Sequence, residues 1–568
     1  MTDQISPKPW HRHYDAGVPH SLKPYPAVTL VDIVAEAAAE TPDKPALFFK
    51  GSIISYGLLE RHGNAVASAL LASGVKRGER VALLMPNSPQ MIVAELGIWK
   101  AGAIAVPLNP LFSEHELTYA LNECAAGTVI VLTPFYRKVK AVQPHTAVHR
   151  VVAVNIKEYL PPLKKVLFTL LKERKGGHRA ALETGDLLFS RMLQGHEGST
   201  KSFPGPAPGD PALFLFTGGT GGLPKCAVST HNAMVMTGMQ IYTWLGSAFE
   251  KGRDVFILNM PLFHAYAQVG VMATGFVGGQ PLALLVNPRD IGDFLDTVRR
   301  LKPSLLAAVP TFYKALFAYP GMKGSRHSLG CLKVCVSSAS PLPAGLRAQV
   351  EDLTGGRFIN AYSLTEATVA TVIEPLSGTK KEGAAGVPCI DVEVRILDQD
   401  DGCTPRSAGE HGEVVIRAPQ LMKEYWNRAE ATAEAIRDGW LYTGDIGYLD
   451  GDGYLFIVDR KKDIIKPGGL QVWPGEVEAV LCDHPLVHEA GVAGVPDDYQ
   501  GEAVKAWVVL NEGARLTEEE LQAFCRGELL HYKVPKHIEF VESLPKSAIG
   551  KLLRRKLNGQ ETVSSPPT

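Results

Sequence analysis

A glycine-rich loop with two hydroxyl groups and a lysine is the strongest chemical signal in the sequence. In LFLFTGGTGGLPK, residues 213–225, an apolar strand runs into a loop that contains Thr217, Gly218, Gly219, Thr220, Gly221, Gly222 and Lys225. Glycines let backbone N–H groups approach anionic oxygens, and the threonines and the lysine add donors and positive charge. The loop therefore predicts phosphate binding, although a glycine-rich turn alone also fits a flexible hairpin. It is not a Walker loop, because Pro224 and Cys226 flank the lysine.

Composition excludes several classes of protein. The chain has 568 residues, with 58 basic and 59 acidic side chains and a net charge of −1. This balance gives no chain-wide basic field, so we expect no nucleic-acid partner. With 45% hydrophobic and 21% charged residues, the chain can bury a full core, and its length predicts more than one domain.

The cysteines and the first residues bear on the compartment. Eight cysteines show no paired close spacing, and the opening MTDQISPKPWHRHYD lacks the charged-then-apolar layout of a secretion signal. We therefore expect a reduced, cytoplasmic protein.

Helix and strand patterns alternate through most of the chain. Thr29 can cap an apolar helix that ends near Glu40, Ser55 can open another helix, and 79–85 reads as a short strand before a helix over 88–100. The same rhythm returns in a strand at 255–263, a helix at 290–301 and a strand at 304–310. This alternation is typical of parallel sheets with crossover helices and predicts a large α/β domain.

The character of the sequence changes after about residue 390. Strand pairs with tight turns such as 450–453 predict an antiparallel or barrel-like β subdomain. A small terminal domain follows from about 459–463, with a helix at 475–483, strands near 488–494 and 502–510, and a helix from 517 to about 530.

One segment has an amphipathic pattern that fits two environments. Residues 157–175 place Leu163, Val166, Leu167, Leu170 and Leu171 at helical spacing beside six basic residues. Such a helix could lie on the anionic inner face of the membrane. The interpretation adopted here is an ordinary surface helix that covers the core, and peripheral membrane contact is left as the alternative.

A series of further motifs follows the glycine-rich loop in a recognisable order. They are PLFHAYA (261–267), SSASPLP (337–343), NAYSLTEA (360–367), LYTGDIGYLDGDGY (441–454), DRKKDIIKPGG (459–469), VWPGEVE (472–478) and PKSAIGKLLRRKL (545–557). Together they resemble the adenylate-forming superfamily of acyl-CoA synthetases, nonribosomal adenylation domains and luciferases. The N-terminal part is most similar to the long-chain fatty-acid–CoA ligases.

The resemblance implies a fold and a reaction. The implied fold is α/β, with a large N-terminal domain over 1–459 that includes the barrel-like β subdomain and a small mobile α+β domain over 460–568. The implied reaction joins a medium- or long-chain fatty acid to coenzyme A through an acyl adenylate, using ATP and magnesium and releasing AMP and pyrophosphate. Two alternatives stay open: adenylation of another acid for CoA or a carrier protein, and a nucleotide-binding pseudoenzyme. A homodimer is also left open.

The resemblance further implies roles for individual residues. Lys551, Thr217 and Glu366 would be catalytic, with Glu366 holding the magnesium. His264 would border the acyl pocket, and Lys462 would be the hinge between the domains. The nucleotide and CoA would be bound by Thr217, Gly218, Gly219, Thr220, Gly221, Gly222, Lys225, Ser338, Ala339, Ser340, Tyr362, Ser363, Thr365, Asp445, Arg460, Gly468 and Gly469.

Overall fold

Capping side chains begin the first helices where the sequence predicts them. In the computed structural model, Thr29 accepts a hydrogen bond from the Asp32 backbone N–H over 3.2 Å at the start of α1 (Leu30–Glu40). Ser55 does the same for α2 (Tyr56–Ala72), and Ser88 for α3 (Pro89–Lys100). These side-chain oxygens satisfy N–H groups that have no partner within the helix. The structure describes residues 8–196, 198, 203, 205–217, 224–324, 326–340, 342–343, 345–547 and 550–558.

Two large sheets form the body of the chain within the described residues. The first is mostly parallel, with the order β19 (Glu424–Tyr425), β9 (Cys226–Thr230), β8 (Pro211–Phe216), β4 (Ile104–Pro107), β3 (Arg80–Leu84), β5 (Thr128–Leu132), β6 (Arg150–Val154) and β7 (Leu187–Leu188). The second has the order β16 (Val387–Pro388), β15 (Val369–Ile373), β14 (Arg357–Leu364), β13 (Val334–Ser337), β12 (Leu305–Ala308), β10 (Phe256–Leu258), β11 (Leu282–Leu284), β1 (Pro45–Phe49) and β2 (Ser52–Ser55). The predicted α/β class is confirmed.

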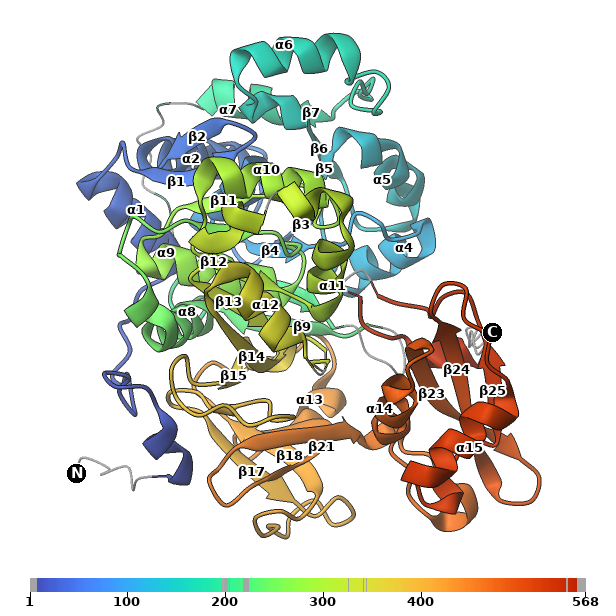
Figure 1. Cartoon of the computed structure of the whole chain (residues 1–568). Coiled ribbons are helices and arrows are strands. Elements are labelled where there is room, and N and C mark those ends of the chain that lie inside the picture. The colour runs from blue at the N-terminus through green and yellow to red at the C-terminus, as the bar shows by residue number, and fades with distance from the viewer. Residues whose placement is uncertain are drawn as a thin grey trace.

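Helices pack on both sheets (Figure 1), most of them around one large apolar cluster and α4 and α5 around a second one. Besides α1 to α3 they are α4 (Glu114–Glu123), α5 (Tyr136–Val142), α7 (Phe189–His196), α8 (His231–Leu245), α9 (Thr274–Gly278), α10 (Ile291–Leu301), α11 (Pro310–Ala318), α12 (Leu346–Thr354) and α13 (Ala429–Ala435).

The expected strand at 255–263 is shorter than predicted. Strand β10 ends at Leu258, and the chain then enters a π-helix, η6 (Tyr266–Ala273), that continues directly into α9. All eight residues of η6 are buried. Because β10, η6 and α9 are each apolar, strand and helix could not be separated by hydropathy alone in this stretch.

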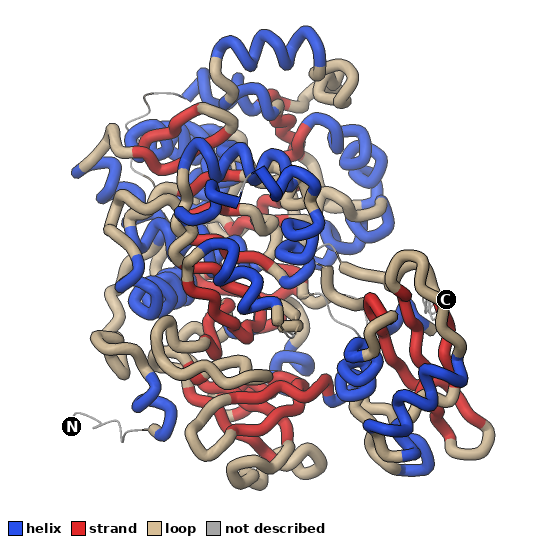
Figure 2. Tube along the Cα trace, in the orientation of Figure 1, coloured by secondary structure: helices blue, strands red, loops and turns tan. Residues whose placement is uncertain are grey.

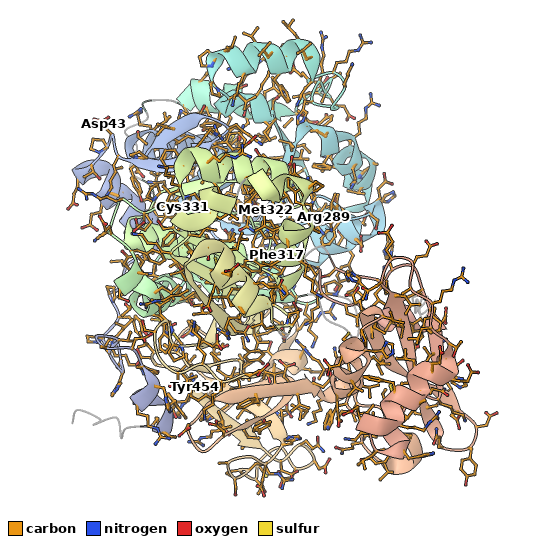
Figure 3. All side chains as sticks on the ribbon, in the orientation of Figure 1. Asp43, Arg289, Phe317, Met322, Cys331 and Tyr454 are labelled. Atoms are coloured by element: carbon orange, nitrogen blue, oxygen red, sulfur yellow. The ribbon has the colours of Figure 1, made fainter. Side chains whose placement is uncertain are left out.

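An antiparallel sheet follows, as the change of sequence character predicts. It contains β17 (Glu393–Leu397), β18 (Gly412–Arg417), β21 (Trp440–Leu449), β20 (Ile436–Arg437) and β22 (Leu455–Arg460). The turn between β21 and β22 is closed by a 2.9 Å hydrogen bond from the Gly453 N–H to the Asp450 carbonyl. Tyr454, labelled in Figure 3, is fully buried beside this turn and donates its hydroxyl to the Thr379 carbonyl.

The C-terminal part forms a lobe beside the large body (Figure 1). Its sheet has the order β23 (Val487–Asp497), β24 (Gly501–Leu510) and β25 (His537–Phe540), and the lobe also contains α14 (Pro474–Asp483), α15 (Glu518–Glu528) and α16 (Arg554–Leu557). Figure 2 shows helices lying over these strands. The lobe has its own apolar cluster, which includes Val477, Leu481, Val492, Val508 and Leu521.

Helix α6 (Pro162–Leu171) contradicts the interpretation that it covers the core. None of its residues is buried, and Leu163 and Leu170 are 72% and 75% exposed. The helix lies at the outer edge of the large body (Figure 1), with only Phe168 packed against the core cluster. No helix among the described residues has both the length and the hydropathy to cross a bilayer.

Close packing of α2 on α3 generates the first prediction. A Cβ at Gly97 would lie 2.4 Å from Cβ of Val66 and 3.0 Å from the Gly63 carbonyl oxygen. Gly97→Ala should therefore destabilise the large domain by about 1–3 kcal/mol through overpacking and lower its melting temperature. Gly195→Ala in α7 is the matched control, because no atom lies within 4 Å of its added Cβ. Equal melting temperatures for the two variants, measured by calorimetry, would contradict the packing argument.

Candidate active site

The predicted site residues gather where strands of different sheets end. Thr217 follows β8, Ser338 follows β13, and Tyr362 lies near the end of β14. Carboxyl ends of parallel strands form the edge at which α/β proteins bind ligands. The antiparallel sheet meets this edge through Asp445 on β21.

Asp445 is held at the centre of the cluster by two partners. The Tyr362 hydroxyl donates to its Oδ2 over 2.5 Å, and Nε of Arg460 lies 2.6 Å from its Oδ1. Asp445 and Arg460 are register partners on β21 and β22, so the sheet itself places this ion pair. Burial and the neighbouring Asp445 carboxylate raise the pKa of Tyr362 well above its usual range, which keeps the phenol protonated. The arrangement leaves a fixed carboxylate and a guanidinium at one edge of the site.

A second corner brings together Glu366, Tyr425 and Lys225. The Tyr425 hydroxyl donates to Oε1 of Glu366 over 2.7 Å, and Nζ of Lys225 lies 4.9 Å from the centre of the Tyr425 ring. Lys225 is exposed, and its carbonyl accepts the Thr217 N–H over 2.9 Å, which closes the base of the glycine-rich loop. The five central loop residues, Gly218, Gly219, Thr220, Gly221 and Gly222, lie outside the described residues.

The chemistry of this corner fits a magnesium ion. Among the described residues no group of three or more His, Cys, Asp and Glu side chains could hold a metal. Mg²⁺ does not need such a group, since it is commonly bound by one or two carboxylates together with phosphate oxygens and water. Glu366, with Lys225 beside it, supplies the carboxylate for that mode of binding.

The segment after β13 has an unusual backbone. Ala339 has φ +72°, a left-handed conformation that favours glycine, and Ser340 next to it is partly buried. Buried Ser338 places its Oγ 3.1 Å from Oγ of Ser363, which joins the segment to β14. Thr365 begins the short helix η9 (Thr365–Ala367) that presents Glu366. The left-handed turn thus brings the 338–340 segment and the 362–366 segment to one place.

Lys551 reaches the site from the C-terminal lobe. The turn before it has Gly550 at φ +78°, and a Cβ there would lie 2.5 Å from Oγ1 of Thr311 on α11, so only glycine allows this approach. Burial and the positive charge of Arg460 lower the pKa of Lys551 to about 8. His264 is close enough that burial and Lys551 together lower its pKa to about 4, so its imidazole is neutral near pH 7.

An apolar pocket adjoins these residues. It lies between α8, η6 and the second large sheet, with Tyr266, Gly270 and Val369 in its wall, and Ser338 and Tyr362 also line it. His264 is not among the lining residues. A largely apolar pocket beside a charged cluster can hold the hydrocarbon part of an amphiphilic ligand.

Three of the predicted residues lie at the start of the C-terminal lobe. Lys462 is in η10 (Lys461–Asp463), where partial burial and the charge of Arg460 lower its pKa and the charges of Asp445 and Lys225 also act on it. Gly468 and Gly469 are exposed in η11 (Pro467–Gly469) with φ +59° and +86°, and the described residues leave open space where their Cβ atoms would be. Their surroundings allow a ligand to approach the backbone closely.

Two contributors were not predicted from the sequence. Tyr425 carries no local signal. The pairing of β19 with β9 and the hydrogen bond from the Met422 N–H to the Glu366 carbonyl place it beside Glu366. Arg554 lies in the basic run after Lys551 and is bound by Glu478 at 2.7 Å and by Asp463 at 3.3 Å. The basic run can be recognised in the sequence, but tertiary contacts decide which of its residues forms an ion pair.

Comparison with known proteins agrees with this arrangement over nearly the whole chain. Residues 34–426 match the family described as AMP-binding enzyme, and residues 476–551 match the AMP-binding enzyme C-terminal domain. A long-chain-fatty-acid–CoA ligase of Bacillus subtilis is 37% identical over 560 residues, which cover 98% of this chain and 99% of the relative. One of Escherichia coli O157:H7 is 34% identical over 97% of this chain and 98% of the relative.

Solved structures of CoA ligases and related enzymes are also similar to this chain over most of its length. An anthranilate CoA ligase in complex with anthranoyl-AMP has a TM-score of 0.81 at 27% identity, covering 94% of this chain and 98% of that one. ATP-bound MatB from Rhodopseudomonas palustris also has a TM-score of 0.81, at 26% identity, covering 94% and 99%. By sequence, by fold and by the convergence of its charged side chains on one pocket, this chain belongs to the family of AMP-binding enzymes.

Proposed function

We propose that the chain is an ATP-dependent acyl-CoA ligase that activates a medium- or long-chain fatty acid. The observation that carries the proposal is the position of Lys551 near Asp445 and Arg460, while Tyr362, the hydrogen-bond partner of Asp445, lines an apolar pocket. A ligand with a carboxylate and a hydrocarbon chain matches that combination of charge and apolar wall. Each CH₂ group buried in such a pocket contributes about 0.8 kcal/mol.

The first half of the reaction joins two anions. A carboxylate oxygen of the acid attacks the α-phosphorus of ATP, the bond from that phosphorus to the bridging oxygen breaks, and pyrophosphate leaves. The Lys551 ammonium lies between both reactants and offsets their repulsion, while Lys225 and Thr217 bind the phosphates. Glu366 would hold the magnesium ion, which would supply positive charge to the phosphate oxygens.

The nucleotide is positioned by the residues around Asp445. Its carboxylate accepts hydrogen bonds from the ribose hydroxyls, and the Tyr362 ring lies against adenine. Ser338, Ala339, Ser340, Ser363 and Thr365 line the same edge. The hydrogen bond from Tyr362 and the ion pair with Arg460 support this role, because they fix the orientation of the Asp445 carboxylate.

The second half of the reaction, thioester formation, uses a different face of the C-terminal lobe. The CoA sulfur attacks the acyl carbon, the bond from that carbon to the AMP oxygen breaks, and AMP leaves. The lobe, residues 460–568, turns about Lys462 relative to 1–459 and presents Gly468 and Gly469 to the pantetheine arm. A separate apolar cluster within the lobe supports movement as a unit.

A panel of acids with ATP, magnesium and the purified chain tests the activity. A CoA ligase releases AMP and forms a thioester only when CoA is present. An enzyme that serves a carrier protein forms the adenylate but no CoA thioester. A pseudoenzyme binds nucleotide without releasing pyrophosphate.

Loss of the Lys551 charge should affect one half-reaction. Lys551→Ala should slow adenylate formation by about 10²- to 10³-fold, because one cation that stabilises the transition state is lost. Thioester formation from supplied acyl adenylate should stay near the wild-type rate. Lys556→Ala, which removes an exposed lysine of the same run, is the control and should leave both rates unchanged. Equal loss of both half-reactions in Lys551→Ala would refute the assigned role.

The pH dependence of adenylation follows from the same side chain. Because the pKa of Lys551 is lowered to about 8, the free enzyme loses this positive charge as the pH rises through 8. The value of kcat/KM for adenylation should therefore fall on the alkaline side with an apparent pKa near that value. Lys551→Arg, whose guanidinium stays charged, should remove this alkaline limb even if its overall rate is lower. An unchanged alkaline limb in Lys551→Arg would assign the titration to another group.

We further propose that helix α6 rests on an anionic membrane surface at the cytoplasmic side. Its apolar residues Leu163, Val166, Leu167, Leu170 and Leu171 are between 47% and 75% exposed. Exposed basic residues accompany them at 164, 165, 172, 174 and 175. Apolar side chains can enter the headgroup region while the basic ones meet anionic lipids. Such contact would place the enzyme where its apolar substrate resides.

We also expect the chain to associate into homodimers. Measuring the mass of the protein in solution tests this expectation.

Vesicle sedimentation tests the membrane contact. The combined change Leu163→Glu and Leu170→Glu should weaken binding to anionic phospholipid vesicles at least about tenfold, since burial of one leucine contributes roughly 1.5–3 kcal/mol. Leu111→Glu alters an equally exposed leucine elsewhere and serves as the control. Activity on a dissolved short acid should not change. Equal sedimentation of wild type and the double variant would exclude α6 as the contact.

A further inference from the structure

Two polar side chains face each other in the core, between α3 and the π-helix η6. Both Glu95 and Gln268 have 0% exposure, and Nε2 of Gln268 donates a hydrogen bond to Oε1 of Glu95. The two remaining oxygens, Oε2 of Glu95 and Oε1 of Gln268, are buried without a hydrogen-bond partner among the described residues. Unpaired buried oxygens are costly, so this pair needs a physical explanation.

Protonation of Glu95 provides that explanation. A carboxylate and an amide oxygen both accept hydrogen bonds, so they cannot satisfy each other. A protonated carboxyl group has an O–H on Oε2, which is the donor that Oε1 of Gln268 lacks. The acid and the amide then close a ring with two hydrogen bonds. Burial raises the pKa of Glu95 to about 8, against a smaller lowering by the Gln268 hydrogen bond, which agrees with a neutral acid at pH 7.

No neighbouring charge shifts the pKa of Glu95. The elements packed on α3 and η6 are α1, α2, β4, η4 (Ile156–Tyr159), α8, α9, β10 and β15. Together with α3 and η6 themselves, they carry Asp32, Glu36, Glu40, Tyr56, Glu60, Arg61, His62, Lys100, Lys157, Glu158, Tyr159, His231, Tyr242 and Tyr266. Among the described residues, only burial and Gln268 act on the Glu95 pKa.

The same helix forms part of the apolar pocket with residues on its other side. Tyr266 and Gly270, each two positions from Gln268, line the pocket. They are tightly packed, because a Cβ at Gly270 would lie 3.1 Å from Cδ2 of Tyr266 and 3.4 Å from Cγ1 of Val369. A π-helix is rarely stable by itself and often occurs at functional sites. Its conformation here therefore needs an anchor.

We propose that Glu95 and Gln268 form a positioning pair that anchors the π-helix to α3 and thereby fixes the Tyr266–Gly270 wall of the pocket. The identity of the pocket ligand rests on the function proposed above. Loss of the Glu95 proton breaks one of the two hydrogen bonds and leaves a buried negative charge. The anchor then loosens, and the pocket wall loses its defined shape.

Glu95→Gln gives the sharpest test, because an amide at this position makes both hydrogen bonds at every pH. The KM of the wild type for the fatty acid, divided by the KM of Glu95→Gln at the same pH, should rise about tenfold between pH 7 and pH 9, the loss expected for one buried hydrogen bond. Lys551 is the same in both proteins, so its own titration cancels in the comparison. Parallel pH profiles of the two proteins would overturn the proposal.

A double variant separates positioning from stability. Leucine at both positions, Glu95→Leu with Gln268→Leu, removes the pair but keeps the core apolar and filled. We expect a melting temperature at or above that of the wild type, together with a higher KM for the acid, a broader chain-length preference and an unchanged KM for ATP. Equal changes in both KM values, or unchanged chain-length preference, would show that the pair has no positioning role.

A stability measurement tests the pair even if no acid is a substrate. The folded pKa of Glu95 is raised from 4.5 to about 8, so between these values the folded chain keeps a proton that the unfolded chain releases. The stability of the wild type relative to Glu95→Gln should therefore be highest below pH 4.5, fall as the pH rises and level off above 8. A difference that does not depend on pH would overturn the protonated pair, whereas a failed acid panel with the expected stability curve would overturn only the proposed activity.

Discussion

The site depends on one positive charge that is carried from the C-terminal lobe into a cluster built by the large domain. Lys551 can lie there only because Gly550 lets the backbone come against Thr311 on α11. A larger residue at this turn would hold the lobe away and leave the cluster without its ammonium group.

Other charges near Lys551 are already paired. Asp445 is shared by Arg460 and Tyr362, and Arg554 is bound by Glu478. Buried charges are tolerated only with such partners, because removing an unpaired ion from water costs several kcal/mol. Among the described residues no ion pair involves the Lys551 ammonium. An ammonium group without an ion-pair partner, next to charges that are already paired, is suited to bind an anionic group.

Two residues in or next to the wall of the same pocket have a strained backbone. Ala339 and Val369 both have positive φ, +72° and +83°, although neither is glycine. Val369 is β-branched, which makes this conformation costly, and it lies in the pocket wall opposite Gly270. The surrounding core has to hold these residues in place, and the anchored π-helix on the other side of the pocket contributes to that rigidity.

Local patterns in the sequence predicted the capped helices and the family, but not the π-helix that follows β10. Caps at Thr29, Ser55 and Ser88 begin helices because their side chains satisfy N–H groups within the next turn, an interaction between near neighbours. The glycine-rich loop and the later motifs indicated the family for the same reason, since each motif is a contiguous run of residues.

Contacts between distant segments were decided by the tertiary structure alone. Tyr425 meets Glu366 through contacts between distant segments, and the apolar face of α6 is exposed although its sequence fits a helix that covers the core. Glu95 and Gln268 lie 173 residues apart, and nothing local to either one predicts that the other satisfies it. Hydropathy reports whether a side chain prefers to be buried, but the partner it meets there depends on how the whole chain closes around it.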